Sequence, residues 1–412
     1  MKFIFADSQD FIDPNYDFER DTYSKNRVIQ RTDRYPHEMF REKVYDGMLV
    51  SRAILADGVY KSSGIYSIMQ SQRFKREGAS RFLRYDGQIF GDCGAFSYVK
   101  LDKPPYQNEE MVDYYTQCGF THAFSIDHII FEYDIKYDDK NSDAKVTDDM
   151  KRRFQITQDN AKEFLRISKE KNAPFEPIGV VQAWSPKTMQ KASKSLVDMG
   201  YKYIAIGGLV PLDANQCEEI VKAIREIIPF DIKIHLFGFA KANQLEQFLP
   251  YNITSFDSTS PLTRAFKDKK FNYFTPKERY TAIRIPSSDG TASLKRKISS
   301  GLISQEKAQK MEKESLKAIR DYDKGMTSLE DALDKISAYE KLFRVKIPIE
   351  RYQQVLKDKY WQQCPCEICQ AVGVEVIIFR NSNRNRRRGF HNLWQFMREL
   401  EALLKGHNIG KR

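Results

Sequence analysis

Carboxylates that come at the end of strand-like runs are the residues with the clearest chemical potential in this chain. Asp92, Asp127 and Asp257 each end a short run rich in β-branched and aromatic residues. Two carboxylates that face one pocket, such as Asp92 and Asp257, can act as nucleophile and general acid/base at an anomeric carbon, through a covalent glycosyl intermediate and with overall retention. A single aspartate after a strand is usually a turn former, so the prediction depends on the set.

An amide and a pair of glycines end two further runs of the same kind. Gln182 ends one run, and Gly207 with Gly208 ends the other. Asp127 and Gln182 together suit the donor and acceptor edge of a purine-like base. Glycines let backbone amides approach a ligand closely. The sequence therefore predicts a base-binding pocket beside the carboxylate pair.

The elements that must position these residues are repeated βα units. Up to about residue 258, short β-branched or aromatic runs alternate with amphipathic stretches. The eight candidate strands are 2–6, 47–53, 88–92, 121–127, 176–182, 201–207, 233–239 and 253–257. Eight units with connections too long for hairpins predict a (β/α)8 TIM barrel, whose C-terminal mouth gathers the polar strand ends into an active site. A doubly wound open sheet is the alternative that periodicity leaves open.

Helical patterns support the βα units up to about residue 258 and are of a different kind beyond it. The stretch 186–199 has Ser185 as a cap and Gly200 after its end, and an apolar stripe over 220–228 predicts the next helix. Beyond residue 258 a helical hairpin is predicted over 304–343, followed by a last helix over about 391–405. The predicted domains are a catalytic barrel over 1–274, a Lys-rich helical insertion over 275–355, and a subdomain over 356–412 that carries a cysteine cluster, an Arg-rich loop and the closing helix.

A cluster of cysteines near the C-terminus predicts a metal site. Cys364, Cys366 and Cys369 fall within six residues, and His391 follows further along. Three thiolates and one imidazole make a closed tetrahedral site of the kind that structural Zn²⁺ prefers, with no open position for a reacting water. The alternative, ordinary buried thiols, does not account for three cysteines so close together.

Basic residues in two segments predict contact with a nucleic-acid backbone. The run 380–388 is rich in arginine, and 264–284 interleaves basic residues with aromatics. The candidate contacts are Arg264, Lys267, Arg380, Arg384, Arg386, Arg387 and Arg388. A solvated charged surface is the plainer alternative.

Composition limits the class of protein. The 412 residues are 41% hydrophobic and 30% charged, and the formal net charge is +11. These values exclude a disordered chain and argue against a membrane protein, and the positive charge makes a polyanionic partner plausible. Six cysteines do not form a disulfide framework, and the first residues are too short an apolar stretch for a signal peptide. We expect a cytoplasmic protein with no membrane segment.

Several motifs resemble those of the tRNA-guanine transglycosylase superfamily. They are Asp-Cys-Gly-Ala-Phe at 92–96, Gly-Val-Val-Gln at 179–182, Gly-Gly-Leu at 207–209, His-Leu-Phe-Gly-Phe at 235–239, Phe-Asp-Ser at 256–258 and the Cys-x-Cys-x-x-Cys set with His391-Asn392, all in family order. The resemblance implies a zinc-containing barrel, a pentosyltransferase that exchanges guanine for a 7-deazaguanine. It places the nucleophile on Asp257 and the second catalytic aspartate on Asp92, and base recognition on Asp127, Gln182, Gly207, Gly208 and Leu209.

Departures from the family pattern resemble its DNA-modifying branch, DpdA. Ala95 and Ser97 stand where the tRNA enzymes carry Gly and Gln, the stretch from Asp257 to Cys364 is longer than theirs, and no RNA-binding domain is expected after the final helix. The branch implies DNA as the partner, 7-cyano-7-deazaguanine (preQ0) or a relative as the incoming base, and an ATPase partner that opens the duplex. A tRNA transglycosylase with an unusual insert, a non-catalytic zinc-stabilised nucleic-acid-binding subunit and, more remotely, a glycoside hydrolase stay open as alternatives.

Overall fold

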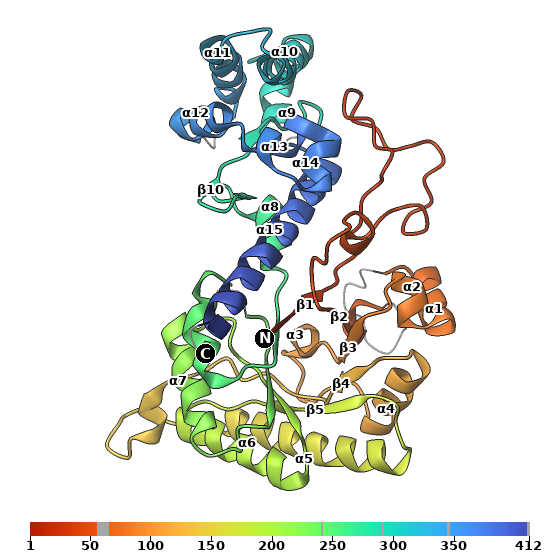
Figure 1. The fold of residues 1–412 in the computed structure, drawn as a ribbon, viewed down its shortest axis with the longest axis vertical. Coiled ribbons are helices and arrows are strands. Elements are labelled where there is room, and N and C mark those ends of the chain that lie inside the picture. Colours follow the sequence, from red (N-terminus) through yellow and green to blue (C-terminus); the bar gives the residue numbers. More distant parts are fainter. Residues whose placement is uncertain (56–65, 240–241, 291, 344–346, 410–412) are drawn as a thin grey trace. The chain divides into compact units, whose positions relative to one another are not determined.

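The computed structural model describes residues 1–55, 66–239, 242–290, 292–343 and 347–409. The chain forms two units, which Figure 1 shows in colours that follow the sequence. The barrel unit consists of residues 1–9, 45–259 and 403–412, and the second unit of residues 10–44 and 260–402.

A closed barrel of eight parallel strands forms the centre of the barrel unit. In barrel order the strands are β1 (Lys2–Ala6), β2 (Gly47–Ser51), β3 (Gln88–Asp92), β4 (His122–Phe124), β5 (Glu176–Val181), β6 (Tyr203–Ile206), β7 (Lys233–Leu236) and β8 (Ser255–Asp257). Ile4 pairs with Gly47 on one side and with Asp257 on the other, which closes the ring. The predicted (β/α)8 barrel is confirmed, and the open-sheet alternative is wrong.

Apolar side chains from the strands fill the barrel interior. The buried cluster consists of Ile4, Leu49, Phe90, Phe124, Ile178, Val180, Tyr203 and Ala205. Side chains alternate across a strand, so Ile178 and Val180 of β5 point inward, while Gly179 between them lies against the Tyr201 ring on the outer side. The polar residues that follow each strand are thereby held at the mouth by a rigid core.

Helices with well-defined ends surround the strands. They are α1 (Ile68–Glu77), α2 (Ala79–Leu83), α3 (Ala95–Tyr98), α4 (Asn108–Gln117), α5 (Asp148–Glu170), α6 (Pro186–Met199), α7 (Ala214–Arg225) and the 3-10 segment η4 (Ala242–Tyr251). The helix predicted over 186–199 is confirmed: the Ser185 side chain accepts from the Thr188 N–H, and Gly200 ends the helix at φ +107°. The stripe predicted over 220–228 runs too far, because α7 ends at Arg225 and Ile227 lies partly in solvent beyond it.

The second unit is mostly helical. Its elements are α8 (Ser260–Lys267), the antiparallel pair β9 (Tyr273–Phe274) and β10 (Arg279–Tyr280), the parallel pair β11 (Ile283–Arg284) and β12 (Ile378–Phe379), α9 (Ala292–Ser299), α10 (Gln305–Asp323), α11 (Leu329–Glu340), α12 (Ile349–Asp358), α13 (Tyr360–Gln363), α14 (Glu367–Val372) and most of α15 (Ser382–Ile409). The predicted helical hairpin is confirmed as α10 and α11, and the Ser328 side chain caps α11 by accepting from the Asp331 N–H.

One expectation about the second unit is wrong, and the two units also divide the chain at other positions than the predicted domains. The Arg-rich segment is not a loop, because α15 begins at Ser382 and carries it as helix rather than starting near His391. The division of the chain also differs from the predicted domains, since residues 10–44 and 260–274 group with the second unit instead of the barrel. Residues 10–44 carry acidic groups that bond to arginines of α15, such as Asp21 to Arg384, which accounts for this grouping.

No helix among the described residues is long and apolar enough to cross a membrane.

Candidate active site and metal site

A pocket of about 230 Å³ lies at the C-terminal ends of the barrel strands. Its lining includes six of the predicted site residues: Asp92, Asp127, Gln182, Gly207, Gly208 and Asp257. Leu209, which the family resemblance placed in base recognition, is fully buried and does not line the pocket. The closed barrel thus brings residues from five strands into one cavity, as the strand ends predicted.

Asp257 ends β8 and has one oxygen fixed by two donors. Its Oδ1 accepts from the Gly238 backbone N–H at 2.8 Å and from His235 Nε2 at 3.1 Å. When His235 donates from Nε2, its Nδ1 accepts from the Ser255 hydroxyl at 2.5 Å, and Ser255 Oγ accepts from the Tyr203 hydroxyl at 2.6 Å. This buried chain of hydrogen bonds fixes the carboxylate and the imidazole in one orientation.

Asp92 ends β3 in surroundings that favour its neutral form. Burial, and then the nearby charges of Asp127 and Asp257, raise the pKa of Asp92 to about 7. Its Oδ2 accepts from the Gly94 N–H at 3.0 Å. A carboxyl group with a pKa near neutral can both donate and accept a proton at physiological pH, as a general acid/base must.

Asp127 and Gln182 hold each other in place. Gln182 Nε2 donates to Asp127 Oδ2 at 2.7 Å, and Gln182 Oε1 accepts from the Ile130 N–H at 3.2 Å. Burial raises the pKa of Asp127 to about 6. The other carboxylate oxygen of Asp127, Oδ1, accepts a longer hydrogen bond from the Cys93 thiol, at 3.4 Å. The pair offers fixed acceptors and donors to the polar edge of a planar ligand.

The glycine pair lies against this amide. A Cβ at Gly207 would lie 2.2 Å from Gln182 Nε2, and Gly208 has a φ of +74°, a conformation that favours glycine. Any side chain at these positions would displace Gln182 or strain the backbone, so the need for glycine predicted from the sequence has a steric cause.

Sequence reasoning missed several residues of the pocket. Phe96 and Phe237 line it, and Phe96 is 58% exposed, so its ring is open to a stacking partner. Asp7 also lines the pocket and accepts from the Tyr66 hydroxyl. His235 was missed as a partner of Asp257. Phe96, Phe237 and His235 all lie inside the motifs at 92–96 and 235–239, which was the available signal.

Replacing Asp92 with asparagine is expected to stabilise the protein increasingly as the pH rises from 5 to 8. The folded-state pKa of Asp92 lies above its ordinary value, so wild-type stability is lost as the pH rises through about 7, whereas asparagine does not ionise. The gain is about 3 kcal/mol over this range. Urea unfolding at pH 5 and pH 8 measures it, with Asp143→Asn on the surface as control. An equal stability difference at both pH values would contradict the raised pKa.

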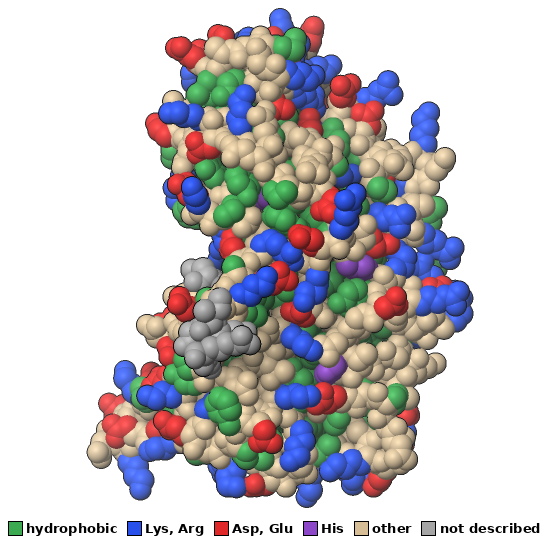
Figure 2. Space-filling model, in the orientation of Figure 1, with side chains coloured by type: hydrophobic (Ala, Val, Ile, Leu, Met, Phe, Trp, Pro, Cys, Tyr) green, Lys and Arg blue, Asp and Glu red, His purple; other side chains and the backbone are tan. Residues whose placement is uncertain are grey.

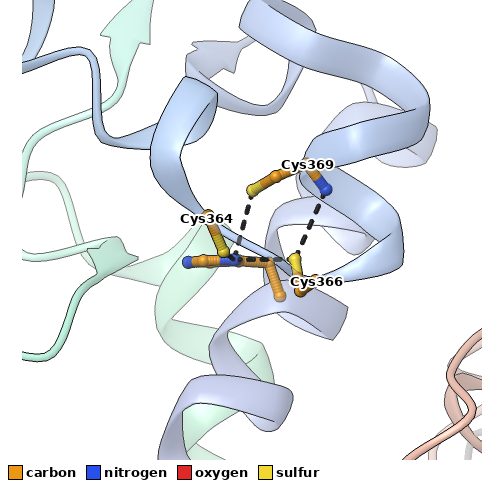
Figure 3. Close-up of side chains that lie close together, drawn as sticks. Cys364, Cys366 and Cys369 are labelled. Atoms are coloured by element: carbon orange, nitrogen blue, oxygen red, sulfur yellow. Dashed lines mark hydrogen bonds between the residues drawn. The ribbon is translucent and has the colours of Figure 1, made fainter.

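The predicted metal ligands lie together inside the second unit. Cys364, Cys366, Cys369 and His391 are buried, and their ligand atoms all lie within 4.8 Å of one another. His391 Nδ1 lies 3.7, 3.3 and 3.4 Å from the three sulfurs in chain order. Figure 3 shows the three cysteine side chains converging on one point. The group could hold a metal ion.

Neighbouring groups orient the histidine and one thiol. His391 Nε2 donates to the Phe274 carbonyl at 2.7 Å, which leaves Nδ1 as the nitrogen that faces the sulfurs. The Tyr273 ring stacks on the His391 ring with centroids 4.6 Å apart. The Cys369 backbone N–H donates to Cys366 Sγ at 3.3 Å. Such second contacts fix the tautomer and the ring orientation of a metal-ligating histidine.

Four of the seven predicted nucleic-acid contacts point into the second unit instead. Arg384 and Arg388 are fully buried, Arg387 is nearly so, and the Arg380 side chain is 8% exposed. Arg384 pairs with Asp21 and Glu375, and the other three bond to carboxylates, carbonyls and amides of the same unit. They therefore offer no charge to a polyanion, and this part of the prediction is wrong.

The other three cations remain open to solvent in part or in full. Lys267 is exposed on α8, and Arg264 and Arg386 are half-buried. Their contact with nucleic acid stays a prediction. Figure 2 shows Lys and Arg side chains spread over the face drawn and mixed with Asp and Glu, so the net positive charge is not concentrated there.

Comparisons with known proteins agree with the geometry. A DNA-guanine transglycosylase of Salmonella montevideo is 42% identical over 411 residues, which is 98% of this chain and 97% of that protein. The tRNA-guanine(15) transglycosylases of Nanoarchaeum equitans and Pyrococcus furiosus are 25% and 29% identical, over 46% and 48% of this chain and 44% and 32% of theirs. A family model for queuine tRNA-ribosyltransferase matches residues 58–403. This chain therefore belongs to the queuine tRNA-ribosyltransferase family.

Proposed function

We propose that this chain is a DNA guanine transglycosylase, which replaces a guanine base of DNA with a 7-deazaguanine such as 7-cyano-7-deazaguanine (preQ0). The observation that carries the proposal is the 42% identity to a DNA-guanine transglycosylase over nearly the whole length of both proteins. The pocket supports it, because it combines a carboxylate pair with a polar recess for a base. The relatives that act on tRNA align over only about half of this chain.

In the first half-reaction Asp257 is the nucleophile. His235 and Gly238 engage Oδ1, so Oδ2 attacks C1′ of the deoxyribose while the bond from C1′ to N9 of guanine breaks. The bonding electrons pass to the departing guanine, and neutral Asp92 supplies the proton that guanine needs. The product is a deoxyribosyl ester of Asp257.

In the second half-reaction the incoming 7-deazaguanine takes the place of guanine. The Asp92 carboxylate, left ionised by the first step, removes the proton from N9, and N9 attacks C1′ as the ester bond to Asp257 breaks. Two inversions at C1′ give overall retention. Asp127 and Gln182 hold the polar edge of either base, and Gly207 and Gly208 let backbone amides approach it.

Zinc in the cysteine-histidine site has a structural part in this proposal. A tetrahedral zinc separates its sulfur and nitrogen ligands by about 3.5 Å, which fits the distances around His391 Nδ1. Cys364, Cys366, Cys369 and His391 would hold the ion with all four positions filled, and it would cross-link α14 to α15. Because four protein ligands leave no open position for a reacting water, zinc supplies stability rather than chemistry.

Base exchange into two polymers tests the proposed function. Purified protein is incubated with radiolabelled guanine, and separately with labelled preQ0, together with duplex DNA or unmodified tRNA, and the digested nucleosides are separated. Label in deoxynucleosides from the DNA reaction alone is the expected result. Label in tRNA alone would favour the alternative of a tRNA transglycosylase. The need for an ATPase partner stays a prediction, and adding such a partner to the DNA reaction tests it.

His235→Ala is expected to lower kcat by about 10²-fold with little change in KM for DNA, because it removes one of the two donors to Asp257 Oδ1. His235→Gln keeps a side-chain N–H and is expected to recover part of the loss. Steady-state exchange kinetics measure both variants. His122→Gln, which alters a histidine that pairs with Glu176 outside the pocket, serves as control. An equal loss in the alanine and glutamine variants, or a rise in KM alone, would contradict a positioning role for His235.

A further inference from the structure

The segment 17–35 of the second unit carries an exposed apolar tip. Val28 and Ile29 are adjacent, and 53% and 57% of their surfaces are exposed. They lie on a tight turn in which the Arg31 and Thr32 N–H groups both donate to the Val28 carbonyl at 3.0 Å. In Figure 1 this segment is part of the dark red stretch that runs as loops. Two neighbouring large aliphatic side chains in water leave apolar area unburied, which makes this turn a candidate contact surface.

A buried ion pair keeps the tip rigid. Arg27 donates to both oxygens of Asp33, at 2.7 and 3.0 Å, and the Asp33 side chain is fully buried. The Gln30 backbone N–H donates to Asp33 Oδ2 at 2.8 Å, which fixes the chain directly after Ile29. The tip is therefore presented in one conformation, although it belongs to no helix or strand.

The buried arginines of the C-terminal segment fix the base of the same loop. Arg380 and Arg384 both pair with Asp21, and Arg320 donates to the Phe18 carbonyl at 2.8 Å. Fixing a long irregular segment costs backbone entropy at every residue, and burying a charge costs free energy unless the charge is paired. These three arginines thus hold the base of a loop whose end is apolar and exposed.

Cations surround the apolar tip. Lys25 and Arg31 lie on either side of it in the sequence and are exposed, whereas the exposed Arg20 at the start of the segment is paired with Asp17. Arg27 is neutralised by Asp33, so the exposed charges around the turn are those of its lysine and arginine neighbours. An apolar point between cations is complementary to duplex nucleic acid, where phosphates flank a stack of apolar base faces.

We propose that Val28 and Ile29 form a wedge that enters the DNA duplex and unstacks base pairs, while Lys25 and Arg31 contact the flanking phosphates. The inference rests on the proposed function, because an enzyme that replaces a base must first take the nucleotide out of the stack. Proteins that bend or open DNA insert aliphatic side chains between base steps in this way. The wedge offsets part of the cost of unstacking and so favours the flipped state.

The wedge is tested by comparing paired and pre-opened DNA. The Val28→Ser/Ile29→Ser double variant is expected to exchange the base at least about 10-fold more slowly than wild type in a fully paired duplex, and within about 2-fold of wild type when the target guanosine lies in an unpaired bubble. Leu302→Ser, at a residue of the second unit that is 77% exposed, is the matched control and is expected to act like wild type on both. Thermal unfolding verifies that all variants are folded.

A second variant tests the cations beside the wedge separately from its two aliphatic side chains. Lys25→Ala/Arg31→Ala is expected to weaken binding to both DNAs alike and to reduce the dependence of binding on salt. An equal loss on both DNAs by the Val28→Ser/Ile29→Ser variant, or no loss on either, would overturn the wedge, and an equal loss would point instead to a contact with a protein. Failure of the wild-type chain to exchange a base in either DNA would overturn the proposed function, and the wedge with it.

Discussion

The Asp257→Asn variant is expected to exchange bases at least about 10⁴-fold more slowly than the wild-type chain. The amide keeps the shape of the carboxylate and can still accept from Gly238 and His235, but its neutral oxygen is a poor nucleophile toward C1′. DNA affinity is expected to stay within about 3-fold of wild type, because the change does not alter the surface that meets the phosphates. Radiolabelled base exchange and fluorescence anisotropy with duplex DNA measure the two quantities.

Asp143→Asn is the control for this experiment, since it makes the same chemical change at an exposed position away from the pocket. Exchange by the Asp257→Asn variant at a rate near that of wild type would remove Asp257 from the nucleophile's role. A parallel loss of DNA binding would mean that the substitution damages more than the chemistry.

The Cys366→Ser variant is expected to lose its bound metal and, with it, the folded state of the second unit. Binding of a structural zinc is worth about 10 kcal/mol or more, which is comparable to the whole stability of a domain. The variant lacks one of the four ligands, so only Cys364, Cys369 and His391 remain in the buried site to hold the metal. Metal content by mass spectrometry and hydrogen exchange over residues 356–402 measure the two effects.

Cys217→Ser is the matched control, because Cys217 is a buried cysteine of α7 in the barrel unit and belongs to no metal-binding group among the described residues. It is expected to keep about one zinc per chain. A Cys366→Ser protein that also keeps one zinc per chain, with unchanged exchange over 356–402, would contradict the structural role of the site.

The barrel could be predicted because its information is local. Each strand is a short apolar run between polar turns, and all eight runs overlap the observed strands. The errors lie at the strand ends, where the predicted run 233–239 is longer than β7. Beyond Leu236 the Phe237 N–H still donates to the Ile206 carbonyl and the Phe239 N–H to the Asp257 carbonyl, whereas the Gly238 N–H between them donates to the Asp257 side chain. Gly238 has a φ of +59°, which breaks the extended backbone, and hydrophobic periodicity does not report such a change.

The pocket was predicted from strand ends, but its supporting contacts were not. His235 lies inside an apolar run and looks like a core residue until the barrel closes and brings β7 beside β8. Arg380 and Arg384 were misplaced for a similar reason, because their partners Asp21 and Glu312 are distant in sequence. A run of cations has the same composition whether it faces solvent or a buried carboxylate, so only the folded structure separates the two.

Mapping the covalent intermediate tests the central claim most directly. The chain is incubated with duplex DNA and with tRNA in the absence of an incoming base, quenched in denaturant and digested, and the peptide that carries a sugar adduct is sequenced by mass spectrometry. We predict an adduct on Asp257 with the mass of a DNA-linked deoxyribose, together with release of one guanine per adduct. An adduct formed only with tRNA, an adduct on another residue, or guanine exchange into DNA without any adduct would contradict the account.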